Sequence, residues 1–412
     1  MLDQATLNHA AQVLASIPED QRADSALRLY FEAHRYLQPP AKRVISHAVF
    51  VYFRWRSWVD PKAPRQKRVA QALTLHERFT ADPKSIKTET LAAFAVPAWL
   101  WNELDLPAAP SSDSASEAPD QAAATSRTLL KEGATAKRVP SSKAEYLRQL
   151  QRDPALWLRA RPGTAAALAK SLFACELTPL APDALRFTGT QDLFRTAQFT
   201  AGEFEIQDLA SQLVSLAAAP QPGETWWDTC AGEGGKTLHL AGLMQNKGVV
   251  WASDRNAKRL ETLKRRAGRA KVFNYRVALW EDGQKLPTKT KFDGILVDAP
   301  CSGVGTWQRN PHARWATALD DVRELAVTQR GLLDAVAGSL KPGGRLIYSV
   351  CTLTRTETTT LADAFTAAHP ELEPLPLPIA PAGSADPSRV ILWPQDINAN
   401  GMFIAGWRLK KT

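Results

Sequence analysis

The sequence predicts an α/β protein whose parallel sheet carries helices on both faces, preceded by an all-helical N-terminal domain. From about residue 220 onward, apolar runs typical of buried strands (ETWWDTC, GVVWASD, FDGILVDAP and GRLIYSVCT) alternate with helical stretches that begin near 236, 255 and 320. Strands that alternate with helices in this way form parallel sheets. Such sheets bind their ligands at the carboxyl ends of the strands, so the residues that follow each strand are the candidates for function.

The first 105 residues are predicted to form a small bundle of helices. In RVISHAVFVYFRW, apolar residues recur at helical spacing with arginines among them: Ile45, Val49, Tyr52 and Phe53. The basic stretch WVDPKAPRQKR is open to two interpretations, an RNA contact or a solvated loop. Residues 106–139 include PAAPSSDSASEAPDQAAATSR, which has no aromatic or large aliphatic residue, so we expect a flexible linker there.

Charge and cysteine content restrict the class of protein. The net charge of +9 fits a polyanionic partner such as nucleic acid, and it fits a solvated basic surface equally well. The four cysteines are far apart and form no CxxC pair, so we expect neither a metal site nor a disulfide framework. No apolar run approaches the ~20 residues that span a bilayer, and the N-terminus lacks the features of a signal peptide. We therefore expect a cytoplasmic monomer with no membrane partner.

A glycine-rich turn follows the first of these strands in WWDTCAGEGGKTLHLA, residues 226–241. It is not a phosphate-binding loop, because Cys230 stands where that motif requires glycine and Thr237 breaks the GxGxxG pattern. The next strand ends in Asp254, at the spacing where nucleotide-binding sheets place an acid on the ribose. This combination suits S-adenosylmethionine, which has a ribose and an adenine but no phosphate. A dehydrogenase is the alternative, and a helix cap is the structural interpretation of Asp254.

Two cysteines follow two later strands, Cys301 in DAPCSG and Cys351 in YSVCT, and Asp298 precedes the first of them. If these strands are neighbours, both thiols and the carboxylate face the methyl-donor site. Methylation of cytosine at C5 needs such groups: a thiolate that adds at C6 activates C5, and a carboxylate near N3 and N4 stabilises the adduct. A free thiol titrates near pH ~8.5, so the nucleophile needs a nearby cation, for which Lys236 is a candidate.

The chain resembles the RNA cytosine-C5 methyltransferases of the Sun/Fmu type, which act on bacterial small-subunit ribosomal RNA. Six signatures occur in the family's order over about residues 155–410: GEFEIQDLAS, DTCAGEGGKTLHLA, SDRNAKRL, LVDAPCSGVGTWQRNP, LKPGGRLIYSVCTLTRTE and NGMFIAGWR. The resemblance implies a Rossmann-like S-adenosylmethionine-dependent methyltransferase domain at 221–412. It also implies a small subdomain of that module at 140–220 and a NusB-like RNA-binding domain at 1–105.

The resemblance also implies roles for individual residues. Cys351 would be the nucleophile, Cys301 would assist product release, and Asp298 would hold the base. The residues expected to bind S-adenosyl-L-methionine are Cys230, Ala231, Gly232, Glu233, Gly234, Gly235, Lys236, Asp254, Arg259, Glu281, Asp282 and Asp298. The family usually has Ala-Pro where this chain has Gly-Glu at 232–233, and the adenine contact is open between residues 281 and 282.

The resemblance favours an RNA cytosine-C5 methyltransferase with ribosomal RNA as its target and transfer RNA as the alternative. A DNA cytosine-C5 methyltransferase would attack through the cysteine after the proline and has no need of Cys351. A non-catalytic RNA-binding assembly factor on the same fold would be expected to lose one thiol, and this chain has both. Cys230 is expected to line the turn as a small apolar residue, and Cys175, in SLFACEL, to lie in a helix core.

Overall fold

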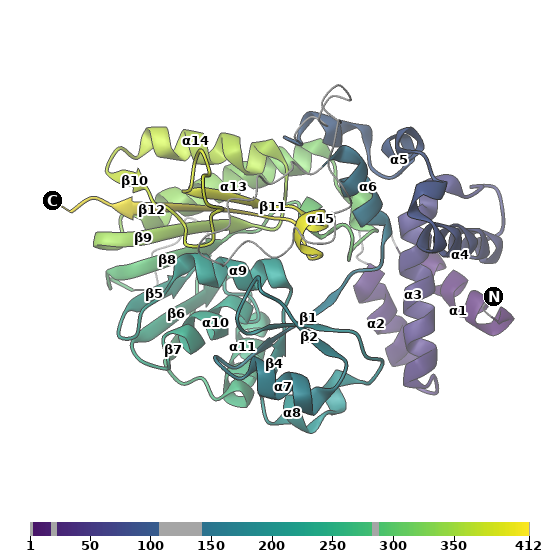
Figure 1. Cartoon of the computed structure of the whole chain (residues 1–412), viewed down its shortest axis with the longest axis horizontal. Coiled ribbons are helices and arrows are strands. Elements are labelled where there is room, and N and C mark those ends of the chain that lie inside the picture. Colours follow the sequence, from purple (N-terminus) through teal and green to yellow (C-terminus); the bar gives the residue numbers. More distant parts are fainter. Residues whose placement is uncertain (1–2, 18–22, 107–141, 282–287, 412) are drawn as a thin grey trace, which may run out of the picture.

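The structure is a computed structural model in which residues 3–17, 23–106, 142–281 and 288–411 are described (Figure 1). The α-helices are α1 Gln4–Ala15, α2 Ala23–Ala33, α3 Pro39–Trp55, α4 Arg65–Ala81, α5 Thr88–Phe94, α6 Lys143–Gln151, α7 Ala165–Leu172, α8 Ala197–Thr200, α9 Leu209–Ala218, α10 Gly235–Leu243, α11 Ala257–Ala270, α12 Ala313–Ala316, α13 Leu319–Ala337, α14 Thr359–Ala368 and α15 Pro394–Ile397. The strands are β1 Leu156–Ala160, β2 Cys175–Leu177, β3 Ala184–Phe187, β4 Phe204–Ile206, β5 Thr225–Asp228, β6 Val249–Asp254, β7 Tyr275–Leu279, β8 Phe292–Asp298, β9 Leu340–Val350, β10 Leu372–Pro374, β11 Arg389–Leu392 and β12 Met402–Leu409. Asp282 and the predicted linker, apart from residue 106, lie outside the described residues.

The larger sheet has the strand order β10-β12-β9-β8-β5-β6-β7, and β11 pairs with β12. Strands β5 to β9 pair in parallel, whereas β12 is antiparallel to β9. From β5 the chain continues to β6 and β7 on one side, and then to β8 and β9 on the other. The topological switch point therefore lies between β5 and β8, where an open α/β sheet binds its ligands. The predicted parallel α/β sheet is confirmed.

Successive residues of the central strands face opposite layers of helices, since side chains alternate along a strand. Trp226 and Leu296 share a core with residues of α9 and α10, while Trp227 and Val297 pack with α13 and α14. Figure 1 shows α13 and α14 above the sheet and α9, α10 and α11 below it. Because both faces are covered, the strands are continuous apolar runs, which is why the sequence pattern identified them.

A smaller antiparallel sheet, in the order β2-β3-β1-β4, has its own core of Leu158, Leu185 and Phe204. It is joined to the start of α10 by Arg159 of β1, whose Nη1 donates to the carbonyl oxygen of Gly235 at 2.9 Å. The expectation that Cys175 lies in a helix core was wrong, because Cys175 opens β2. Helix α7 ends at Leu172, and the two following residues adopt positive φ angles that no helix continues.

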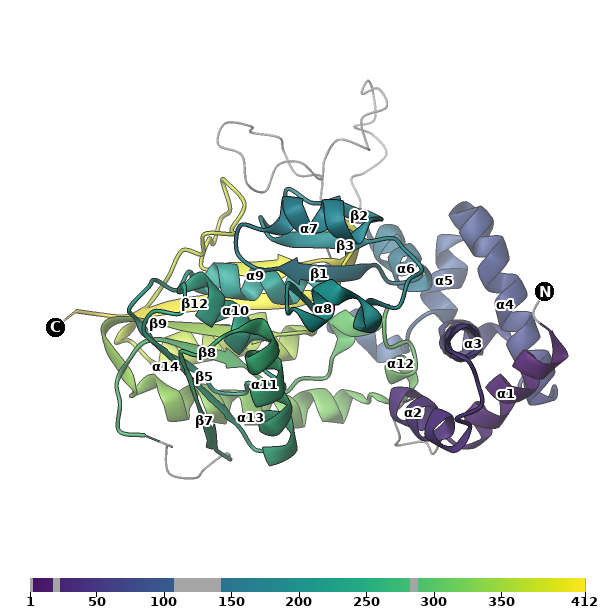
Figure 2. The ribbon, with the colours of Figure 1, turned by 90° about the horizontal axis from the view of Figure 1, so that it is seen from below.

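Helices α1 to α5 lie at one end of the molecule, and α6 lies between them and the larger sheet (Figures 1 and 2). The predicted helical region is confirmed, and the four apolar residues of α3 on which it rested are buried. The core of these helices extends beyond the N-terminal region. It includes Tyr146 of α6, Val304 and Trp307 after β8, and Leu353 after β9.

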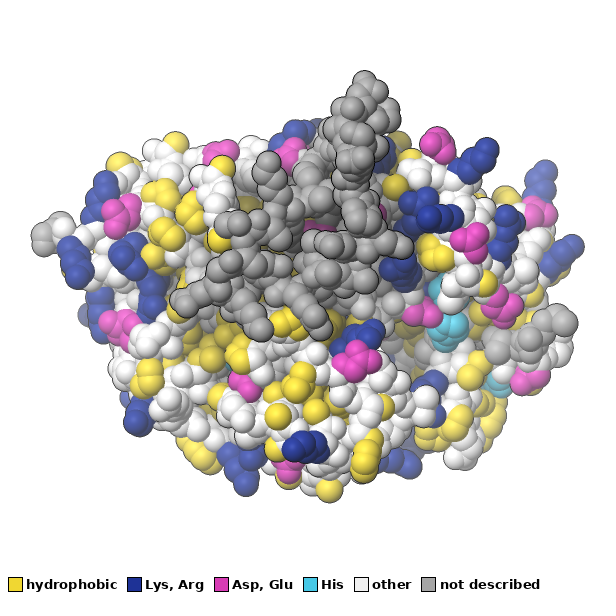
Figure 3. Space-filling model, in the orientation of Figure 1, with side chains coloured by type: hydrophobic (Ala, Val, Ile, Leu, Met, Phe, Trp, Pro, Cys, Tyr) yellow, Lys and Arg dark blue, Asp and Glu magenta, His cyan; other side chains and the backbone are white. Residues whose placement is uncertain are grey.

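Basic side chains on the face shown in Figure 3 are spread over both the N-terminal helices and the sheet region, with acidic side chains among them. Part of the basic helix α11 is neutralised within the fold, since Arg266 and Arg269 both pair with Glu205 of β4. Those two arginines therefore connect α11 to the smaller sheet. Among the described residues, no helix has the length and apolar character needed to cross a membrane.

Candidate active site

The carboxyl edge of the larger sheet brings together the two thiols that follow β8 and β9. Because these strands pair in parallel, with Asp298 opposite Ser349, the chain leaves both at the same edge. The Sγ atoms of Cys301 and Cys351 lie 3.3 Å apart. Cys230 follows β5 and packs against the core beneath α13, and burial raises the pKa of its thiol.

Asp298, at the end of β8, is held by two donors. Its Oδ1 accepts a hydrogen bond from Ser349 Oγ at 2.8 Å, and its Oδ2 accepts one from Lys236 Nζ at 2.7 Å. Burial disfavours the charge of Lys236, but the Asp298 carboxylate outweighs burial and raises the pKa of Lys236. The Lys236 cation therefore lies beside the Asp298 carboxylate at the thiol edge, the carboxyl edge of the larger sheet where Cys301 and Cys351 lie. This is the location that the sequence suggested for Lys236.

The two thiols have unequal environments. The hydrogen bond from Cys301 lowers the pKa of Cys351, and the positive charges of Lys236 and Arg309 act in the same direction against burial. The same hydrogen bond, burial and the nearby Glu357 carboxylate raise the pKa of Cys301. When the pair carries one proton, the negative charge therefore resides on Cys351 and the proton on Cys301.

This asymmetry makes a testable prediction about thiol reactivity. Alkylation of Cys351 by iodoacetamide should show a pH midpoint below the ~8.5 of a free thiol. In Lys236→Met, the midpoint should rise by about one pH unit, or ~1.4 kcal/mol, because the cation that favours the thiolate is gone. Mass spectrometry of the labelled peptides across neutral to alkaline pH measures both midpoints.

Lys341→Met is the matched control for Lys236→Met. Lys341 Nζ also lies 2.7 Å from an aspartate oxygen, that of Asp293, but this pair is at the opposite end of strands β8 and β9. Lys341→Met should leave the pH midpoint of Cys351 alkylation unchanged. Equal midpoints in the wild type and both variants would contradict the assignment of Lys236 as the cation that favours the thiolate.

Sequence reasoning missed Glu357, which holds the loop that carries Cys301. Its side chain is fully buried and accepts hydrogen bonds from Ser302 N at 2.9 Å, Thr354 Oγ1 at 2.7 Å and Gln329 Nε2 at 2.8 Å, and also from the Ser302 hydroxyl. Gln329 Nε2 also donates to the carbonyl oxygen of Pro300 at 2.9 Å. Glu357 lies within the SVCTLTRTE signature, so its position was visible, but its partner Ser302 is 55 residues away.

The glycine turn has the backbone conformation that its sequence suggested. Gly232 and Gly234 have φ angles of +55° and +84°, and a Cβ at these positions would lie 2.4 Å from Arg259 Nη2 and 2.5 Å from Leu263 Cγ respectively. Only glycine fits both requirements. The intervening Glu233 is exposed, and its carbonyl oxygen accepts a hydrogen bond from Arg266 Nη1 at 3.0 Å.

Asp254 ties the end of β6 to this turn. Its Oδ2 accepts a hydrogen bond from Gly232 N at 2.9 Å, and its Oδ1 accepts one from Asn256 N at 2.8 Å. Arg259 Nη1 lies 3.5 Å from the same Oδ2. The N-cap of α11 is Asn256, whose side chain accepts from the backbone N–H groups of residues 258 and 259, so the helix-cap interpretation of Asp254 is wrong.

A further carboxylate that the sequence analysis did not single out lies beneath the turn. Asp228 is fully buried at the end of β5; Thr237 Oγ1 donates to its Oδ2 at 2.6 Å, and its Oδ1 has no hydrogen-bond partner. Burial raises the pKa of Asp228 to about 7. An unpartnered buried acceptor beside a glycine turn fits a ligand that carries N–H or O–H groups, such as the amino acid moiety and ribose of S-adenosylmethionine. Glu281 is exposed just beyond β7.

The strand order, the switch point and the glycine turn with its acid at the end of β6 define the fold class of S-adenosylmethionine-dependent methyltransferases. Within that class, residues 215–408 match the family described as 16S rRNA methyltransferase RsmB/F. The resemblance seen in the sequence is thereby confirmed.

Two curated relatives illustrate the match. The "Probable ribosomal RNA small subunit methyltransferase B" of Synechocystis sp. is 34% identical over 273 residues, which cover 63% of this chain and 60% of that protein. The ribosomal RNA small subunit methyltransferase F of Cronobacter sakazakii is 36% identical over 230 residues, which cover 53% of this chain and 46% of that protein. The chain thus spans about half to three fifths of the length of these relatives.

Two solved structures share the fold. PH0851 superposes with a TM-score of 0.74 at 22% identity and covers 99% of both chains. NSun6 from Pyrococcus horikoshii, solved with SFG, superposes with a TM-score of 0.59 at 19% identity and covers 66% of this chain and 94% of that chain. At these identities the likeness establishes the common architecture, including that of the N-terminal region in the first case.

Proposed function

We propose that this protein methylates C5 of cytosine in RNA, with small-subunit ribosomal RNA as the target. The observation that carries the proposal is the thiol pair of Cys301 and Cys351 at 3.3 Å, beside an aspartate held by a lysine. A single nucleophile suffices for simple substitution chemistry, whereas addition to a pyrimidine followed by elimination needs a group that attacks and a group that removes a proton. The N-terminal helices are proposed to add RNA contacts, as the resemblance implies.

In the first step, the Cys351 thiolate adds to C6 and the electrons of the C5–C6 double bond become available at C5. Lys236 favours the attacking thiolate, and Asp298 receives the N3 and N4 edge of the base. When bound, S-adenosylmethionine supplies the electrophilic methyl group that C5 takes. Arg309 is exposed on the loop after Cys301 and close enough to influence Cys351, and we propose that it contacts a backbone phosphate.

In the second step, the adduct must lose the C5 proton and the C6–sulfur bond. Cys301 gives up its thiol proton to solvent and takes the C5 proton in its place, and the C5–C6 double bond forms again as the C6–sulfur electrons return to Cys351. One proton is released in total, and the pair regains its starting state of one thiolate and one thiol. The hydrogen bond with Cys351, burial and the Glu357 carboxylate raise the pKa of Cys301, so the Cys301 thiolate is the stronger base of the two.

Asp254 is proposed to bind the ribose of the methyl donor, with Asp228 and the backbone of the glycine turn completing the site. Asp254→Ala should weaken S-adenosylmethionine binding by about tenfold or more, which corresponds to ~1.4 kcal/mol. Isothermal calorimetry measures the affinity. Asp293→Ala is the control, since that carboxylate also accepts a backbone N–H, from Thr225 at 2.8 Å, but at the opposite end of the sheet. Unchanged affinity in a folded Asp254→Ala would remove Asp254 from the site.

Transfer of a labelled methyl group to ribosomal RNA, transfer RNA and DNA tests the proposed function. RNA labelled with tritium at cytosine C5 makes the test specific for position, because C5 methylation releases one tritium for each methyl group transferred. Bisulfite mapping of RNA from a deletion strain and its parent then identifies the nucleotide. Transfer to transfer RNA alone would change the proposed target, and methylation without tritium release would exclude C5. No transfer to any nucleic acid would favour an assembly factor.

A further inference from the structure

The loops that carry the two thiols continue directly into the core of the N-terminal helices. Val304 and Trp307 follow Cys301, Leu353 follows Cys351, and all three are buried together with residues of α3, α4 and α5. The Trp307 ring meets that of Trp99 edge-on, with 6.0 Å between centroids. The two loops also contact each other, since Gly305 N donates to the carbonyl oxygen of Cys351 at 3.0 Å. The position of each thiol therefore depends on residues far away in sequence.

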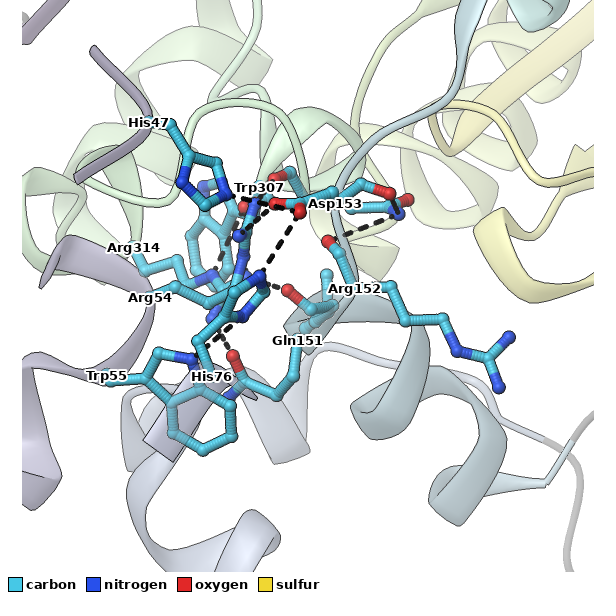
Figure 4. Close-up of polar contacts among 11 residues, drawn as sticks. His47, Arg54, Trp55, His76, Gln151, Arg152, Asp153, Trp307 and Arg314 are labelled. Atoms are coloured by element: carbon cyan, nitrogen blue, oxygen red, sulfur yellow. Dashed lines mark hydrogen bonds and ion pairs between the residues drawn. The ribbon is translucent and has the colours of Figure 1, made fainter. Parts of the chain in front are cut away.

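Arg54, near the end of α3, is the central contact between the helices and the first loop (Figure 4). Its side chain is buried; Nη1 donates to Asp153 Oδ1 at 2.7 Å, and Nη2 donates to the carbonyl oxygen of Gln308 at 3.1 Å. Gln308 is also buried, and its Nε2 donates to the carbonyl oxygen of Asp153 at 3.2 Å. One planar guanidinium thus fixes the segment between α6 and β1 and the loop after Cys301 at the same time.

The loop after Cys351 has a matching contact from the end of the helical region. Arg355 N donates to the carbonyl oxygen of Glu103 at 2.7 Å, and the Glu103 carboxylate accepts hydrogen bonds from Thr356 N at 3.0 Å and Thr356 Oγ1 at 3.1 Å. Arg355 Nη1 also lies 3.1 Å from Asp105 Oδ1. Each thiol loop is therefore held by a separate charged residue of the N-terminal region.

The cluster around Asp153 has the composition of a metal site, because His47, His76 and Asp153 offer ligand atoms that all lie within 4.8 Å of one another. The hydrogen bonds of this cluster indicate instead that it is a hydrogen-bonded network without a metal. Trp55 Nε1, which can only donate, points at His76 Nδ1 at 3.2 Å, so the ring proton of a neutral His76 is on Nε2 and faces Asp153 Oδ2 at 3.1 Å (Figure 4). A metal on Nε2 would need the proton on Nδ1, where the indole N–H already lies.

We propose that Arg54 and Glu103 are positioning residues for Cys301 and Cys351, so that the N-terminal helices are a structural part of the thiol site as well as a proposed RNA-binding region. The role in catalysis rests on the proposed function, whereas the role in holding the thiols together does not. Asp153 serves as the counter-charge that keeps the Arg54 guanidinium in place. Burial would raise the pKa of Asp153, but hydrogen bonds from the two histidines and the charge of Arg54 hold it well below the usual range.

The test compares three variants of the full-length chain: Arg54→Met, Glu103→Ala and the control Val13→Ala. Val13 is buried in the same core on α1, which packs against α3 and α4 rather than the thiol loops. A trivalent arsenical, which requires two adjacent thiols, reports the distance between Cys301 and Cys351 without reference to RNA. S-adenosylmethionine affinity, kcat and the melting temperature are measured on the same samples.

Arg54→Met and Glu103→Ala should each lower kcat and arsenical affinity by roughly tenfold or more, with S-adenosylmethionine affinity unchanged, because small displacements of reacting groups are costly. Val13→Ala should lower the melting temperature but leave kcat and arsenical affinity as in the wild type. Because Glu103 is partly exposed, Glu103→Ala is expected to fold, and it still tests the proposal if Arg54→Met does not fold.

Two results would overturn the inference. The first is that Arg54→Met and Glu103→Ala both keep the arsenical affinity of the wild type and differ from it only in a lower melting temperature, as Val13→Ala does. The second is one zinc per purified chain that is lost in His47→Ala, which would replace the hydrogen-bonded cluster by a metal site. If the wild type transfers no methyl group to RNA, the proposed function fails, and the arsenical comparison still decides whether the helices hold the thiols.

Discussion

Cys351→Ala is expected to transfer no methyl group to RNA and to form no protein–RNA adduct that survives denaturing electrophoresis. Without the attacking thiolate, C5 is not activated and no covalent bond to C6 can form. Cys301→Ala should begin the reaction but not complete it, because the methylated adduct keeps its C5 proton and cannot expel Cys351. This variant should therefore accumulate methylated RNA on the protein, which gel electrophoresis with labelled RNA and labelled methyl donor detects.

The cysteine of the smaller sheet provides the control. Cys175→Ala should transfer methyl groups as the wild type does and trap no RNA, because Cys175 opens β2 and lies outside the carboxyl edge of the larger sheet. A stable adduct in Cys351→Ala instead of Cys301→Ala would reverse the two roles, as in an enzyme that attacks through the cysteine after the proline. If both variants remain active and neither traps RNA, the thiols are structural and the covalent mechanism is wrong.

Deletion of the residues before α6 is expected to abolish methyl transfer at every RNA concentration. The sequence suggested a tethered RNA-binding domain, whose loss would raise only the RNA concentration required. In the structure, the deletion would expose Val304, Trp307 and Leu353, and burial of such side chains contributes ~1.5–3 kcal/mol each. The sum is a large part of the ~5–15 kcal/mol that stabilises a typical domain, so the loops that carry both thiols should lose their fixed structure.

Hydrogen exchange of residues 301–315 and 351–357 measures this loss, together with kcat at saturating RNA. Faster exchange confined to these loops, with exchange of β5 and β6 unchanged, would locate the effect at the thiol edge. A soluble truncated protein with a full kcat and a raised RNA KM would contradict the prediction and restore the role of a tethered RNA-binding domain.

Much of the candidate site could be predicted because its residues follow strands. Asp298, Cys301 and Cys351 were found from two apolar runs, and the structure places both thiols at one edge because β8 and β9 are neighbours. Asp254 was found in the same way, from the end of β6. Cys175 was assigned to a helix core from the stretch SLFACEL, which carries no sign of the positive φ angles that end α7.

By itself, the sequence determined where the strands end, which side chains follow them and which chemistry those side chains permit, because strand periodicity and turn composition are local properties. Only the tertiary structure decided which groups act together. Lys236 meets Asp298 across 62 residues, and Arg54 meets Gln308 across 254 residues. Lys236, Arg54 and Gln308 are removed from water by the packing of distant segments, so their partners are determined by how the chain folds back on itself.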